Sequence, residues 1–134
     1  DHAPHSAEEK SSGLKASLNG ITGLECAFPV LYTGLVKTGM VSLESLIDKI
    51  SLSPKKRFGL PAESGIVEGG RADLTIWDLD AKYTIDSREF QSMGKSTPFD
   101  GYRVYGKCLL TMAGGRMVWK NERAIEDLQQ RNCE

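Results

Sequence analysis

The sequence predicts an α/β chain in which a mostly helical segment, residues 6–59, precedes a small β unit that begins at residue 61. Up to residue 59 the apolar residues recur at helical spacing, whereas beyond residue 61 they alternate or form short β-like runs. The pair Gly114-Gly115 lies between two of these runs, which is typical of a tight hairpin. These three observations indicate one helical part and one β part.

A first helix is expected just after Ser6, because Ser6 and Glu9 have the spacing of a capping box, in which each side chain accepts a backbone N–H bond from the other residue. A second helix follows the short turn over residues 20–23. Its apolar residues recur at helical spacing: Leu24, Ala27, Phe28, Leu31 and Leu35. Pro29 is expected either in the first turn of this helix or at a kink, and Gly39 is its expected end.

Two more helices are expected before residue 60. Ser42 is a favourable N-cap for a helix with one apolar face. That face is formed by Leu43, Leu46, Ile47 and Ile50. Ser53-Pro54 is expected to open a short helix that Gly59 closes. The basic run 55–57 is expected near the C-terminal end of that helix, where positive charge is favourable.

In the β part, Leu74 and Ile76 occupy alternate positions, as in a half-buried strand, and further β-like runs lie between residues 104 and 119. The tail, residues 121–134, is polar and rich in helix formers. Its apolar residues form only a thin stripe: Ala124, Ile125 and Leu128. A solvated or docking helix is expected there.

Composition narrows the class of protein. With 17 basic and 18 acidic residues among 134, the chain has a net charge of −1 and no block of like charges, so neither nucleic acid nor a membrane surface is an expected partner. No apolar run approaches the ~20 residues of a membrane span. The three cysteines match neither a disulfide framework nor a zinc-finger spacing, so a cytoplasmic, reducing setting is expected.

The first five residues, Asp1-His2-Ala3-Pro4-His5, place a carboxylate and two imidazoles around a stiff proline. Asp1 can bind a metal or hold a proton, and Pro4 fixes a backbone torsion that helps to direct His5. Taken alone, the cluster has two other interpretations: a polar, frayed terminus, or an adventitious metal chelate of the terminal amine and His2. A cluster of this kind at the first residue suggests a fragment.

Motifs along most of the chain follow in an order and spacing that resembles the C-terminal third of the bacterial dihydroorotases, which are cyclic amidohydrolases of the amidohydrolase superfamily. The opening motif together with residues 23–36 is the most specific part of the resemblance. The motifs that carry it are residues 1–5, 8–10, 23–29, 31–36, 70–75, 83–86, 94–99 and 104–107.

The resemblance implies the C-terminal part of a metal-dependent (β/α)₈ barrel, whose site lies at the C-terminal ends of the strands, followed by part of a small β-sandwich domain. On this template residues 1–60 are the end of the eighth strand, the catalytic loop and the closing helices of the barrel. Residues 61–120 belong to a composite β domain, and residues 121–134 are a polar C-terminal tail.

The resemblance also assigns roles to single residues. Asp1 is similar to the family's catalytic carboxylate, which contacts the metal and carries a proton to the departing nitrogen. His5 is similar to the substrate-binding histidine that donates to the ring carboxylate of dihydroorotate. Asn19 and Gly20 align with a substrate-contacting segment, although the family's proline two residues before that glycine is missing here, and a plain Asn-Gly turn is the alternative. His2 is expected to be structural.

The function implied is part of a dihydroorotase, which catalyses the reversible, zinc-dependent cyclisation of N-carbamoyl-L-aspartate to (S)-dihydroorotate in de novo pyrimidine (UMP) biosynthesis. One or two zinc ions are expected, with most ligands outside this chain, because the family's His-x-His pair has no counterpart among the two histidines here. The chain alone is therefore expected to be inactive.

The expected partners are the small-molecule substrate and the remainder of the barrel, with a homo-oligomer or aspartate transcarbamoylase as further candidates. Two alternatives to the function remain. The chain can belong to a non-catalytic, dihydroorotase-like scaffold for a transcarbamoylase. It can also belong to a related cyclic-ureide hydrolase of the hydantoinase or allantoinase type, for which the role of His5 is the discriminating feature.

Overall fold

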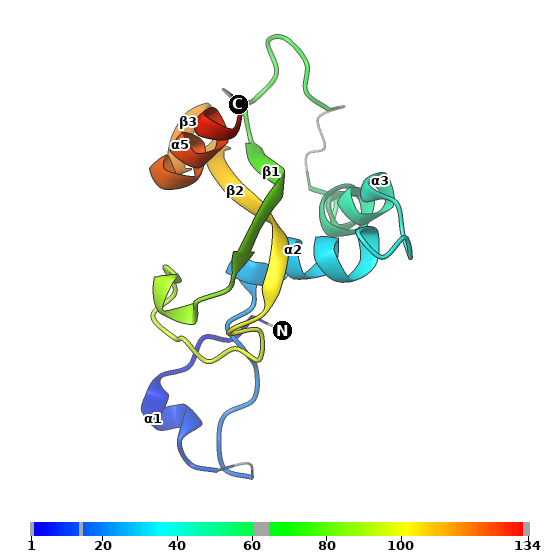
Figure 1. Cartoon of the computed structure of the whole chain (residues 1–134). Helices are drawn as coiled ribbons and strands as arrows, with labels where there is room; N and C mark the ends of the chain where they lie inside the picture. The colour runs from blue at the N-terminus through cyan, green and yellow to red at the C-terminus, as the bar shows by residue number, and fades with distance from the viewer. Residues whose placement is uncertain (1, 14, 61–64, 133–134) are drawn as a thin grey trace.

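The computed structural model describes residues 2–13, 15–60 and 65–132 (Figure 1). Among them, three strands form one antiparallel sheet in the order β1-β2-β3. The strands are β1 (Leu74–Thr84), β2 (Arg103–Ala113) and β3 (Arg116–Lys120). In Figure 1 the helices of residues 27–57 lie on one side of this sheet and α5 (Glu122–Arg131) lies on the other, with α1 (Ala7–Lys10) set apart beyond one end. The predicted order of a helical part and a β part is confirmed.

The capping box at Ser6 is confirmed. The Ser6 hydroxyl accepts a bond from the backbone N–H of Glu9 at 3.2 Å, and the Ser6 N–H donates to Oε2 of Glu9 at 2.8 Å. The helix that these bonds begin, α1, has only 4 residues and buries none of them. Its stability therefore comes from the cap and from contacts with the following loop rather than from an apolar face.

The helical path after residue 23 is built from short pieces of different winding. These are the 3₁₀ turn η1 (Leu24–Cys26), the π turns η2 (Tyr32–Val36) and η3 (Asp48–Leu52), and the α-helices α2 (Ala27–Leu31), α3 (Leu43–Ile47) and α4 (Ser53–Arg57). A second 3₁₀ turn, η4 (Ser87–Glu89), lies apart from this path, in the loop between β1 and β2. Pro29 lies in the first turn of α2, where its missing N–H breaks no helical bond, and η2 ends before the turn at Gly39. The first-turn alternative for Pro29 is thus confirmed.

Ser42 caps α3, since its hydroxyl accepts a bond from the N–H of Ser45 at 3.2 Å. The helix expected at Ser53 does start there as α4, but it is not a separate helix. Leu52 and Ser53 are both in the right-handed helical region, so η3 joins α3 to α4 without a break. A π turn forms bonds to the fifth residue along, which lets the backbone continue past Pro54. The basic run 55–57 lies in the last turn of α4, as predicted.

The sheet is more continuous than the sequence pattern indicated, because β1 and β2 each run over 11 residues. The predicted hairpin is confirmed: Gly114 and Gly115 join β2 to β3 with φ angles of 57° and 76°, which only glycine adopts readily. The β1-β2 ladder shifts register between Asp78 and Lys82. This bulge lies on the part of β1 that faces α5.

Two apolar clusters hold the helical part against the sheet. One is Cys26, Ile85 and Val104, which joins η1 to β2 and to the loop after β1. The other is Phe28, Tyr32 and Leu46, with Trp77, Leu79 and Tyr105 of the sheet packed against it. On the other side α5 docks through the buried Ala124, which agrees with the docking helix, one of the two alternatives predicted for the tail. The predicted domain boundary falls on residues 61–64, outside the described residues.

Candidate functional site

His5, the predicted substrate-binding histidine, lies on the loop that leads into α1. Its Nε2 atom is 2.9 Å from the backbone oxygen of Asn19, another predicted site residue. Because a carbonyl oxygen only accepts hydrogen bonds, Nε2 carries the proton and donates it to Asn19. The other ring nitrogen, Nδ1, lies 3.7 Å from Oε2 of Glu9, and the His5 side chain is 25% exposed. The structure thus brings together two residues that are 14 positions apart.

Residues 18–20 are held by one ammonium group. Nζ of Lys10 donates to the backbone oxygens of Leu18 and of Gly20, at 2.7 Å each. Gly20 has a φ of 102°, a conformation that favours glycine, while the side chain of Asn19 is exposed to solvent. The segment therefore presents its backbone, not the Asn19 side chain, to His5 and Lys10.

Lys10 is the contributor to this loop that sequence reasoning missed. Residues 8–10 formed one of the recognised motifs, but the motif alone did not assign Lys10 a partner. One feature could have indicated its role. Lys10 ends a four-residue helix and precedes a segment whose backbone oxygens have no strand partners, so the lysine is a nearby donor for them. A small cavity lies at this loop and is lined by Lys10, Gly13, Ser17, Leu18, Asn19 and Gly20.

Glu9 is ionised at neutral pH. The backbone N–H and the hydroxyl of Ser6 lower the pKa of Glu9, and the nearby His5 ring adds a smaller effect in the same direction. The carboxylate therefore has two functions in the loop. It completes the cap of α1 and it faces the imidazole of His5 with a negative charge.

His2 has structural contacts. It forms an isolated parallel bridge with Ile21, and its Nδ1 atom accepts bonds from the N–H groups of Gly23 at 3.3 Å and Leu24 at 3.2 Å. These bonds fix the ring as the tautomer with its proton on Nε2. The ring thereby ties the first residues of the chain to the start of η1.

The predicted catalytic and metal-binding carboxylate, Asp1, lies outside the described residues. Within the part of the chain that the structure describes, no group of three or more His, Cys, Asp or Glu side chains is placed to hold a metal ion. Both histidines contact backbone groups through a ring nitrogen. The described donor set does not fit a zinc site, which takes three or four protein ligands.

The two described cysteines are not activated nucleophiles. Burial raises the pKa of the Cys26 thiol, and burial likewise raises the pKa of the Cys108 thiol. A thiol rather than a thiolate is a weak nucleophile and a poor metal ligand.

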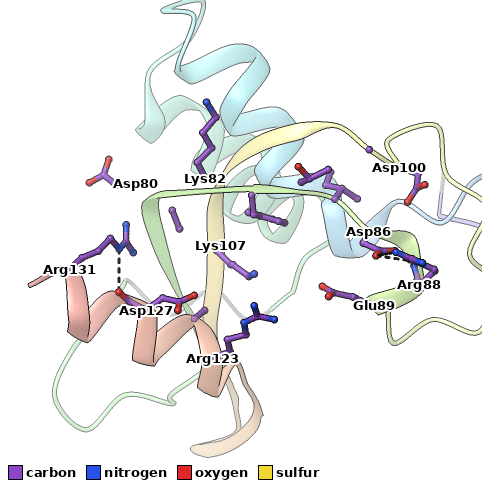
Figure 2. A pocket seen from close by; sticks show the side chains of 16 residues that line it. Asp80, Lys82, Asp86, Arg88, Glu89, Asp100, Lys107, Arg123, Asp127 and Arg131 are labelled. Atoms are coloured by element: carbon purple, nitrogen blue, oxygen red, sulfur yellow. Dashed lines mark hydrogen bonds and ion pairs between the residues drawn. The ribbon is translucent and has the colours of Figure 1, made fainter.

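A pocket of about 900 Å³, which shares no lining residue with the His5 loop, is lined by β1, β2, α5 and the loop between β1 and β2 (Figure 2). Its acidic side chains are Asp80, Asp86, Glu89, Asp100 and Asp127, and its basic ones are Lys82, Arg88, Lys107, Arg123 and Arg131. Several of these charges are paired within the chain. Hydrogen bonds from Arg88, for example, lower the pKa of Asp86 to about 2. The lining therefore has no excess of either charge.

The chain belongs to the amidohydrolase family, whose sequence model matches residues 1–118. Its relatives include the dihydroorotase of Bacillus cytotoxicus, which is 48% identical over 126 residues, and that of Bacillus thuringiensis, which is 47% identical over 125 residues. Each of these matches covers 93% of this chain but only 29% of the relative. The chain therefore spans less than a third of the length of the curated relatives that it matches.

Solved hydantoinases have the same fold over most of the chain. The L-hydantoinase (dihydropyrimidinase) from Arthrobacter aurescens is 39% identical, with a TM-score of 0.70 over 78% of this chain and 24% of its own. The D-hydantoinase (dihydropyrimidinase) from a Thermus species is 27% identical, with a TM-score of 0.78 over 90% of this chain and 27% of its own. Among the described residues, no helix is long and apolar enough to cross a membrane.

Proposed function

We propose that this chain is part of a dihydroorotase and that the complete enzyme interconverts N-carbamoyl-L-aspartate and (S)-dihydroorotate in de novo pyrimidine (UMP) biosynthesis. The observation that carries the proposal is the 47–48% identity to two Bacillus dihydroorotases over 93% of the chain. The solved hydantoinase from Arthrobacter aurescens, in comparison, is 39% identical over a smaller share. The geometry of the His5 loop supports the same substrate.

His5 is the proposed donor to the substrate carboxylate. In the structure its Nε2–H group is bonded to the backbone oxygen of Asn19, a neutral acceptor. A hydrogen bond from the imidazole to an ionised carboxylate is roughly twice as strong as one to a neutral acceptor. A carboxylate that enters the loop therefore competes favourably with Asn19 for this proton. The backbone of Asn19 and Gly20 then borders the substrate ring.

Asp1 is the proposed metal-contacting carboxylate and proton carrier. The proposal includes one or two zinc ions, with most of their ligands outside this chain. The remaining strands of the (β/α)₈ barrel are also outside this chain in the proposal, because the matched relatives are more than three times as long. Residues 1–60 would complete the barrel and residues 61–120 the β domain. The 134 residues alone are then expected to be inactive.

The setting and partners of the complete enzyme extend the proposal. Free thiols at Cys26 and Cys108 support a reducing cytoplasm. A homo-oligomer, or a complex with aspartate transcarbamoylase, is the proposed assembly. Size-exclusion chromatography of the complete enzyme, alone and with the transcarbamoylase, tests this part independently of the reaction.

Turnover of dihydroorotate and of hydantoin, which lacks the carboxylate, tests the function in the complete enzyme. We expect wild type to prefer dihydroorotate. Removal of a hydrogen bond to a charged group costs about 1.5–3 kcal/mol, so His5→Ala should raise KM for dihydroorotate roughly 10- to 100-fold. Activity towards hydantoin, the internal control, should be unaffected. A preference for hydantoin, or an unchanged KM in His5→Ala, would instead favour the hydantoinase alternative.

A further inference from the structure

The loop between β1 and β2 passes beside the His5 loop, although about 90 residues separate them in sequence (Figure 1). Gly94 of this loop lies directly against the backbone of Pro4 and His5. A Cβ atom added at Gly94 would lie 2.7 Å from the backbone oxygen of His5, 2.8 Å from the carbonyl carbon of Pro4 and 2.9 Å from the nitrogen of His5. These are backbone atoms, so no side-chain rotation relieves the clash. The φ of Gly94 is not positive, which means that space alone demands the glycine.

Thr22 bonds directly to the same loop. It is fully buried, its N–H donates to the backbone oxygen of Ser96 at 2.8 Å, and its hydroxyl donates to the backbone oxygen of Gly94 at 2.9 Å. The preceding residue, Ile21, accepts a bond from the N–H of Ala3 at 2.8 Å. Residues 21 and 22 therefore lie between the start of the chain and the Gly94 segment and are bonded to both.

Glu25 anchors the beginning of this segment. Its two carboxylate oxygens accept bonds from the N–H groups of Gln91 at 2.7 Å and Ser92 at 2.9 Å. The loop is thus attached at residues 91–92 by Glu25 and at residues 94–96 by Thr22. With both ends attached, the backbone at Gly94 has little freedom to move away from Pro4 and His5.

We propose that Gly94 and Thr22 are positioning residues for His5, through which the loop of the β unit sets where the imidazole lies. This inference rests on the proposed function only in giving His5 a substrate. Gly94 limits the Pro4–His5 peptide from one side, and the Thr22 hydroxyl holds Gly94 against it, so this role requires neither residue to touch substrate. The β unit then contributes to substrate binding although it supplies no group that reacts.

The structure sets the size of the effect. In Gly94→Ala the new methyl group would lie 2.7 Å from the His5 oxygen, whereas an ordinary contact begins at 3.4 Å. The His5 oxygen must therefore move away by about 0.7 Å. Displacements of about 1 Å in a positioned group can cost up to ~100-fold in activity. We therefore expect Gly94→Ala to raise KM for dihydroorotate by about 10-fold in the complete enzyme, with a smaller change in kcat.

The experiment combines kinetics with hydrogen exchange of residues 2–10, which needs no substrate. Gly34→Ala is the matched control, because Gly34 has open space around its Cβ position and no positive φ. We expect faster exchange at the Ala3 amide in Gly94→Ala, unchanged exchange in Gly34→Ala, and KM raised only in the former. Unchanged exchange in Gly94→Ala would overturn the proposal, and so would faster exchange without a change in KM.

Thr22 gives a second pair of variants. Thr22→Val removes the hydroxyl that donates to Gly94, whereas Thr22→Ser keeps it. We expect Val to reproduce the faster exchange and Ser to restore wild-type behaviour; equal behaviour of the two variants would overturn the role of the hydroxyl. If wild type failed to turn over dihydroorotate while exchange still followed this pattern, the proposed function would be wrong and the positioning of His5 by Gly94 would stand.

Discussion

Lys10→Met is the substitution that most directly tests how the loop beside His5 is held. The lysine donates from one ammonium group to the backbone oxygens of Leu18 and Gly20, at 2.7 Å each. Methionine keeps an unbranched side chain and good helix propensity but removes the charge and both donors. The backbone of Lys10 and its cap at Ser6 are unaffected by this change.

The structure sets the expected magnitude. A hydrogen bond from a charged donor contributes about 1.5–3 kcal/mol, but the bond to Leu18 is exposed and therefore weakened by water, so we expect about 2 kcal/mol for the pair. At about 1.4 kcal/mol for each factor of 10, this corresponds to a roughly 30-fold increase in the population of the open loop.

Amide hydrogen exchange by NMR, in the complete enzyme, measures that population. The N–H of Leu18 bonds to the backbone oxygen of Glu9 at 3.3 Å, so its protection reports closure of the loop. We expect its protection factor to fall by about 30-fold in Lys10→Met. Lys15→Met is the control, because Lys15 is exposed and has no hydrogen bond or ion pair with the described residues. Protection of Leu18 within a factor of about two of wild type would refute the reasoning.

Two further predictions concern Glu25 and α5. Burial raises the pKa of Glu25, but the N–H donors of residues 91–92 outweigh burial, so the pKa of Glu25 lies below 4.5. The bonds from Glu25 to residues 91–92 therefore stabilise the fold above about pH 4.5, and this stabilisation is lost as the pH falls through the lowered pKa. The difference in thermal midpoint between wild type and Glu25→Gln should therefore shrink as the pH falls below 4.5, and a constant difference would contradict this prediction. Arg131→Met leaves the buried Asp78 without its ion pair. Because Arg131 is 43% exposed, we expect the free energy of unfolding, measured in urea, to fall by only about 1–2 kcal/mol. An unchanged free energy of unfolding would exclude a role for the pair in docking α5.

Much of the local structure could be predicted from the sequence because its causes lie within a few residues. The capping box of Ser6 and Glu9, the cap at Ser42 and the hairpin at Gly114-Gly115 each depend on hydrogen bonds or backbone angles that neighbouring residues set. The merging of α3 and α4 was not predicted. Ser53-Pro54 normally favours a helix start, whereas the π turn before it let the helical path continue.

The site roles of His5, Asn19 and Gly20 stay predictions, but the structure shows how two of these residues lie. The motif pattern singled out His5 and Asn19, and the structure places the imidazole against the Asn19 carbonyl. Asp1 stays a prediction. Lys10 was missed, because a lysine with two carbonyl partners has the same sequence signature as one in solvent until the fold of residues 18–20 is known.

By itself the sequence determined the class of fold, the family resemblance and the local caps and turns, since these follow from short-range hydrogen bonds and from the order of motifs. Only the tertiary structure decided why Gly94 is a glycine and what Thr22 holds. In sequence Gly94 resembles any loop glycine. The reason for it, a backbone less than 3 Å from where its Cβ would be, belongs to a segment about 90 residues away and exists only once the chain has folded.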